Sequence, residues 1–208
     1  MTFRQLFLLL LPCLALFLNS CCQPPPANYT QRPATLNKIS KLEKDLLKLL
    51  PKTQAVKPEV QKEAHWISKT AYAQSAEIAR VNEHLLFGWL NNILVNSKIK
   101  KRGLCWHYQH DLYRELRHRP LHYFHLGLTT RDKGKGSSHS CVWVNHKGGG
   151  FANSLVLDAW ARCGHLKVIP AEDRGDNWID EPDWEKYVGQ AFPEGHTYSM
   201  KAYIKDSE

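Results

Sequence analysis

The sequence lacks several patterns that would by themselves assign a function. Its longest apolar run, Leu6–Leu18, is interrupted by Pro12 and is about 13 residues long, whereas a membrane-spanning helix needs about 20. It contains no internal repeat, no His-Glu-x-x-His or Cys-x-x-Cys pair, and no Gly-x-x-x-x-Gly-Lys-Ser/Thr loop. These absences argue against a membrane-embedded protein, a repeat protein, a common zinc site and a P-loop nucleotide site.

The sequence is also short of acidic residues, which leaves a net charge of +8 over 208 residues. No recognition helix, zinc finger or aromatic-interleaved RNA motif accompanies this charge, so we expect no nucleic-acid partner. Anionic lipid headgroups or anionic cell-wall polymers are simpler partners for an exported basic protein. The length favours one domain.

The N-terminal residues have the pattern of a targeting segment. Arg4 precedes the apolar run, and Leu18-Asn19-Ser20-Cys21 resembles the bacterial lipobox, whose cysteine becomes lipid-modified. We therefore predict a signal peptide over 1–20, lipidation of Cys21, and export to the periplasm or cell exterior with a membrane anchor. A plain cleaved signal is the alternative. The Pro-rich residues 21–37 predict an extended tether.

The cysteine count singles out one thiol. If residues 1–37 are a signal and tether, the folded part contains Cys105, Cys141 and Cys163. An odd number in an oxidising compartment leaves one unpaired thiol. We predict a disulfide between Cys141 and Cys163, with Cys105 free. Two alternatives remain open: three buried free thiols, and a redox pair of Cys105 with Cys141, which needs their Cα atoms within about 7 Å.

Hydrophobic periodicity predicts helices followed by strands. Apolar residues at three- and four-residue spacing predict helices over 38–50, 58–79, 81–95 and 104–117. Alternating or β-branched segments joined by Gly-rich turns predict strands over 121–129, 138–145, 153–160 and 166–169. This order is typical of an α+β domain with an antiparallel sheet, here residues 38–208 with an N-terminal helical segment.

Three residues in this pattern predict nucleophilic chemistry. Cys105 begins a helix directly after Gly103, where unpaired backbone N–H groups stabilise a thiolate and can bind an oxyanion. His139 begins one strand and Asp158 ends the next, so the intervening turn can bring the two side chains together. His would then take the thiol proton, and Asp would orient His.

Gly103-Leu104-Cys105, His139 and Asp158-Ala159-Trp160 together resemble the core of the transglutaminase-like superfamily, over about residues 80–170. The resemblance implies a papain-like fold, with a catalytic helix packed on an antiparallel sheet, and thioester chemistry. It implies Cys105 as nucleophile, His139 as general base and acid, and Asp158 as orienting carboxylate. Ser140-Cys141 and Ala159 depart from the usual Ala-Trp and Pro of the family.

The resulting function is a cysteine peptidase or amidase acting on a peptide, protein or cell-wall amide, without a cofactor. Hydrolysis is favoured over crosslinking because water is the default acceptor. The alternative is a catalytically silent binding module that keeps the fold. Asn91, Asn92 and Trp106 are candidates for an oxyanion donor. We predict no metal site, because the polar residues of the 104–117 helix fit a solvent-facing stripe, namely His107, His110, Asp111, Arg114 and His118.

Overall fold

The computed structural model describes residues 23–84, 88–173 and 177–191. Within them the fold is mixed α+β, with helices packed on a five-stranded antiparallel sheet of order β4-β3-β2-β1-β5. The predicted α+β class and antiparallel sheet are confirmed. The strands are β1 (Phe124–Arg131), β2 (His139–His146), β3 (Leu155–Asp158), β4 (Lys167–Pro170) and β5 (Trp178–Asp180).

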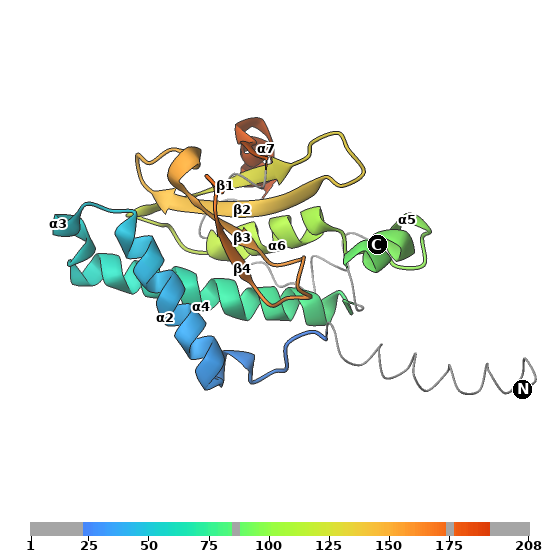
Figure 1. Ribbon diagram of the computed structural model, residues 1–208, viewed down its shortest axis with the longest axis horizontal. Coiled ribbons are helices and arrows are strands. Elements are labelled where there is room, and N and C mark those ends of the chain that lie inside the picture. Colours follow the sequence, from blue (N-terminus) through green and yellow to red (C-terminus); the bar gives the residue numbers. More distant parts are fainter. Residues whose placement is uncertain (1–22, 85–87, 174–176, 192–208) are drawn as a thin grey trace, which may run out of the picture.

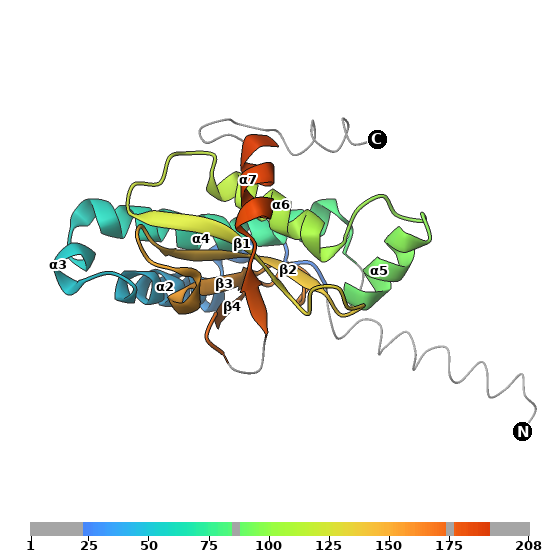
Figure 2. The same ribbon diagram turned by 90° about the horizontal axis from the view of Figure 1, so that it is seen from above.

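The described helices are η1 (Tyr29–Gln31), α2 (Pro33–Lys48), α3 (Lys52–Ala55), α4 (Pro58–Val81), α5 (Gly88–Asn96), α6 (Cys105–Leu116), η2 (Phe151–Asn153) and α7 (Pro182–Ala191). Three of them, α2, α4 and α6, form layers beneath the sheet in the view of Figure 1. Helix α6 lies between α4 and the sheet, and α2 packs on α4 (Figure 1). Helix α7 contacts β1, whereas α5 stands at one end of the molecule (Figure 2).

The core forms where apolar faces of α2, α4 and α6 meet one face of the sheet. Helix α4 contributes Val60, Ile67 and Ile78, all fully buried, and its alanines at positions 64 and 71 let neighbouring helices approach closely. Val142 of β2 belongs to the same cluster, which period-two alternation along the strand explains. Burying each large aliphatic side chain contributes about 1.5–3 kcal/mol.

A buried carboxylate ties α4 to the beginning of the sheet. Glu63 accepts backbone N–H bonds from His122, Tyr123 and Phe124 at 2.8, 2.9 and 3.0 Å. These donors precede or begin β1, so the carboxylate satisfies backbone groups that no strand partner serves. Glu63 thereby fixes the sheet relative to the helical layer.

The described part of the predicted tether is packed and not extended. Tyr29 is buried and its ring lies edge-on to His165, with centroids 5.2 Å apart. Helix α2 already begins at Pro33, a residue suited to the first helical position. The prediction of an extended tether is therefore wrong for residues 23–37. It rested on the Pro-rich composition and overlooked Tyr29, whose ring anchors this segment. The predicted signal peptide and Cys21 lie outside the described residues.

Helix α6 is buried on nearly every side, which contradicts the predicted solvent-facing stripe. Tyr108 and Leu112 face the core as expected, but His110 and Asp111 are also buried. Trp106 and Trp184 pack against the His110 ring, and Arg102 forms a 2.7 Å ion pair with Asp111. The periodicity correctly predicted which face of α6 is polar, but residues from elsewhere in the fold cover that face. Among the described helices, none is long and apolar enough to cross a membrane.

Candidate active site

The N-terminus of α6 is built to hold Cys105 in place. Gly103 has φ +130°, a backbone conformation that other residues rarely adopt, and it turns the chain into the helix. The His107 ring accepts N–H bonds from Gly103 and Leu104 through Nδ1, at 3.3 and 3.1 Å. Burial, with the charges of Arg102 and His110, lowers the pKa of His107 to about 3, so this ring stays neutral and can accept both bonds.

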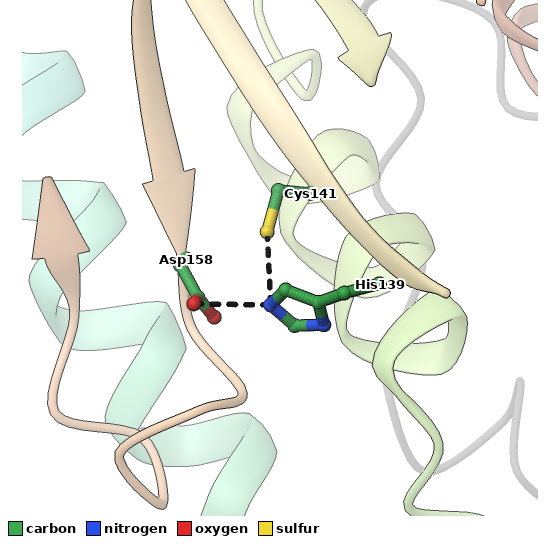
Figure 3. Close-up of side chains that lie close together, drawn as sticks. All are labelled: His139, Cys141 and Asp158. Carbon is green, nitrogen blue, oxygen red and sulfur yellow. Dashed lines mark hydrogen bonds and ion pairs between the residues drawn. The ribbon is translucent and has the colours of Figure 1, made fainter. Parts of the chain in front are cut away.

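His139 and Asp158 come together as the sequence predicted. The β2–β3 register pairs Val142 with Leu157, so Asp158 follows on directly opposite Cys141. His139 Nε2 lies 3.0 Å from Asp158 Oδ2 (Figure 3). Asp158 Oδ1 accepts N–H bonds from Trp160 and Ala161, both at 3.0 Å.

The charge of Asp158 survives its burial. Burial raises the pKa of this carboxyl, but the hydrogen bond and positive charge of His139, with the N–H groups of Ala161 and Trp160, outweigh it and lower the pKa below its usual value. An ionised Asp158 accepts a hydrogen bond from the Nε2–H group of His139. The carboxylate thus selects the tautomer in which Nδ1 carries the lone pair.

The imidazole of His139 has distinct neighbours on its two nitrogens. Nε2 faces Asp158 and also lies 3.4 Å from Cys141 Sγ (Figure 3). Nδ1 is buried and has no hydrogen-bond partner among the described residues. Burial lowers the pKa of His139, but Cys141, Asp158 and Cys105 raise it above its usual value, so the ring readily holds a second proton.

The two free thiols beside His139 differ in how easily they ionise. Burial raises the pKa of Cys105, but the hydrogen-bonding contact and charge of His139 and the N–H groups of Ser140 and Trp106 lower it below its usual value. Burial and the Asp158 carboxylate instead raise the pKa of Cys141 to about 12. Because the thiolate is the nucleophile, the environment favours Cys105.

The predicted disulfide between Cys141 and Cys163 is wrong. Cys141 is a free thiol that faces His139, whereas Cys163 is disulfide-bonded. Cys105 is also free, as predicted, so the partner of Cys163 lies outside the described residues. The cysteine count failed because it looked for a pair only among the three cysteines of the expected folded part.

No protein-family model matches the chain. Comparisons with curated proteins and with solved structures gave no match either. The chemistry of the site must therefore be argued from its geometry.

Two residues that the sequence analysis did not assign hold the site together. Gln109 Nε2 donates to the carbonyl oxygens of Thr129 and Cys141, at 3.1 and 2.7 Å, and so fixes α6 against β1 and β2. Trp160 packs on the His139 ring with centroids 5.1 Å apart, and its Nε1 donates to Gly103 O at 2.8 Å. A polar residue on the core face of α6 was the only signal for Gln109.

A cavity of about 490 Å³ lies next to the N-terminal end of α6 and the start of β2. Its lining includes Trp106, which follows Cys105 in the chain, and Ser138, whose carbonyl oxygen lies 3.9 Å from Cys105 Sγ. Trp184 and a 2.7 Å ion pair between Lys133 and Glu181 contribute to the same cavity. The cavity therefore adjoins the residue after Cys105 and the residues on either side of His139.

The candidate oxyanion donors are unequal. Asn91 is buried and its Oδ1 accepts a hydrogen bond from Lys100 Nζ at 3.0 Å, which fixes its orientation behind the α6 N-terminus. Asn92 Oδ1 is buried without a hydrogen-bond partner in the described residues. Burial raises the pKa of Cys105, but His139 and the backbone N–H groups of Ser140 and Trp106 lower it, so the Trp106 N–H is one of the donors directed at the sulfur.

Proposed function

We propose that this protein is an exported cysteine-dependent acyl-transfer enzyme with a papain- or transglutaminase-like arrangement, acting on a peptide, protein or cell-wall amide. The observation that carries this proposal is the spatial arrangement of Cys105, His139 and Asp158. A thiol of lowered pKa stands at a helix N-terminus beside a histidine, and that histidine donates to a buried carboxylate 3.0 Å away. Order along the chain and the elements that supply each residue agree with the resemblance drawn from the sequence.

The proposed reaction has two halves. The Cys105 thiol gives its proton to His139 Nδ1, and the sulfur attacks the carbonyl carbon. The oxyanion that forms lies at the positive end of α6, where backbone N–H groups stabilise it. His139 then passes its proton to the departing amine as the C–N bond breaks, which leaves a thioester on Cys105. Water or an amine attacks the thioester, gives its proton to His139, and releases Cys105.

Asp158 supports both halves without exchanging a proton. Its negative charge stabilises the imidazolium that exists between the transfers, and its fixed Oδ1 keeps Oδ2 aimed at Nε2. The packing of Trp160 and Trp178 on the ring, at centroid distances of 5.1 and 5.8 Å, excludes water from it. A dry ring strengthens the electrostatic interaction with Asp158.

Hydrolysis is the favoured outcome, since water is the acceptor always present. Export is supported by the disulfide at Cys163, because disulfides persist in oxidising compartments and are rare in the cytosol. With the lipobox-like Cys21, we place the protein on a membrane surface, facing the periplasm or cell exterior.

The test is a covalent adduct. The protein is incubated with peptide thioesters and activated esters, quenched in acid, and digested for mass spectrometry. We expect acylation of Cys105, and its loss in Cys105→Ser and His139→Ala. Acylation on another residue, or none under conditions where Cys105 alkylates readily, would refute the acyl-transfer proposal and favour a silent binding module.

A further inference from the structure

Cys141 occupies a position that the acyl-transfer chemistry does not use. It is a buried free thiol whose sulfur lies 3.4 Å from His139 Nε2, the nitrogen that also faces Asp158. The ligand atoms of His139, Cys141 and Asp158 all lie within 4.8 Å of one another. One nitrogen, one sulfur and one carboxylate oxygen thus converge on a single side of the imidazole (Figure 3).

Two of the three separations among these atoms are close to those between ligands of a tetrahedral zinc ion, and the third is within 4.8 Å. Zn²⁺ lies about 2.0–2.3 Å from N, O and S ligands, so neighbouring ligands of one ion are roughly 3.3–3.8 Å apart. The separation of His139 Nε2 from Asp158 Oδ2 is 3.0 Å, and that from Cys141 Sγ is 3.4 Å. An ion can therefore enter with shifts of a few tenths of an ångström on these two edges.

The surroundings hold these ligands in position. Asp158 Oδ1 is kept by two backbone N–H groups, which leaves Oδ2 for an ion. The His139 ring is held between Trp160 and Trp178, and Cys141 sits on β2, whose backbone is anchored by Gln109. Partners of this kind, which orient metal ligands, commonly set the affinity of a site.

We propose that Cys141, His139 and Asp158 form a binding site for Zn²⁺ that switches off the Cys105 nucleophile. The metal site stands on geometry alone, whereas its inhibitory effect rests on the proposed function. Binding releases the Cys141 thiol proton to solvent, and the ion takes the Nε2 position of the neutral His139 ring, whose single proton moves from Nε2 to Nδ1. The neutral ring then carries its proton on Nδ1, facing Cys105, and cannot accept the thiol proton. Three protein ligands leave one position of the ion open.

The test uses the full chain after removal of metals with a chelator. Zn²⁺ is titrated in competition with a chromophoric chelator, and we expect about one equivalent to bind tightly. Cys141→Ser is expected to weaken binding by about 100-fold or more, because a hydroxyl is a poor zinc ligand. Cys105→Ser is the matched control, since it removes a neighbouring thiol that is not a ligand and should leave binding intact. Co²⁺ in place of Zn²⁺ should show thiolate-to-metal charge transfer that depends on Cys141.

Inhibition is measured separately, as the rate at which iodoacetamide alkylates Cys105. One equivalent of Zn²⁺ should slow alkylation at least about tenfold, reversibly with chelator, and should have no such effect in Cys141→Ser. Substoichiometric binding, or binding that survives Cys141→Ser, would overturn the site. Tight binding that leaves alkylation unchanged would overturn the switch. A failure to acylate Cys105 leaves the zinc titration unaffected, so the two proposals fail separately.

Discussion

Replacing Asp158 with asparagine removes one charge and reverses one hydrogen bond. Oδ1 accepts N–H bonds from Trp160 and Ala161, so the asparagine oxygen should keep that place and its NH₂ group should face His139 Nε2. Two donors cannot face each other. The ring must move its proton to Nδ1, which then points an N–H group at Cys105 where a lone pair is needed.

The magnitude follows from the distance and the burial. Opposite unit charges about 4 Å apart interact by about 4 kcal/mol at an effective dielectric constant of 20. The amide keeps part of the dipolar interaction, so we expect a loss of about 1.4–4 kcal/mol in the stability of the thiolate–imidazolium pair, or roughly 10- to 1,000-fold less thiolate. Asp158 is almost entirely buried, so solvent screens little of this effect.

The assay is the rate of Cys105 alkylation by iodoacetamide between pH 4 and pH 10. In the unaltered protein the reaction should persist well below pH 9.0, the ordinary pKa of the thiol, because the folded protein lowers that pKa. Asp158→Asn should shift the profile to higher pH. Asp45→Asn is the control, since Asp45 is also held by two donors but lies on α2. Identical profiles for Asp158→Asn and the unaltered protein, with both folded, would refute the reasoning.

Four further predictions concern the supports of the site. Trp160→Phe keeps the packing on His139 but loses the bond to Gly103 O, so its Cys105 alkylation rate should lie between those of the unaltered protein and Trp160→Ala; equal rates would contradict this. Glu63→Gln should lower the free energy of unfolding in urea by about 1–3 kcal/mol and leave alkylation unchanged; an unchanged urea midpoint would count against it. Gly103 has φ +130°, so Gly103→Ala should lower the free energy of unfolding in urea by about 1–3 kcal/mol and should slow Cys105 alkylation. His84, His107 and His110 have pKa values lowered to about 4, 3 and 4, mainly by burial. The unfolded chain binds these protons near pH 6.5 and the folded chain does not, so stability should fall as pH drops from 6.5 towards 4, by at most about 1.4 kcal/mol per pH unit for each histidine; urea titrations should show a shallower fall for His107→Gln.

The helices and strands that could be predicted from the sequence are those in which the spacing of apolar residues within the segment itself indicates the structure. Helix α4 and strands β1 and β2 lie within a few residues of their predicted bounds, because their buried faces repeat at helical or strand spacing. Strand β5 and helix α7 were not among the predicted elements. The three residues of β5 pair with Thr129, Thr130 and Arg131, a contact fixed by the far strand and invisible in the segment itself.

The site was predictable as far as its chemistry follows from position in an element. A cysteine at a helix start, a histidine at a strand start and an aspartate at the next strand end could be paired from the sequence. The closure of α6 onto the strands could not, because Gln109 bonds to backbone carbonyls that carry no sequence signal. Burial of His107 and His110 was missed for a related reason: their cover comes from Trp106 and Trp184, one of them in a distant helix.

The comparison of Cys105 with Cys141 explains why position in the chain was not enough to sort the cysteines. Both thiols contact the same imidazole, and both are buried. Cys105 stands at a helix N-terminus with N–H groups directed at it, whereas Cys141 stands mid-strand opposite a carboxylate. The surroundings of Cys105 stabilise a thiolate, whereas those of Cys141 would stabilise a thiolate only with a bound cation. In the mechanism we propose, His139 serves Cys105 through Nδ1 and the zinc site through Nε2, so an ion bound at Nε2 withdraws the base from Cys105.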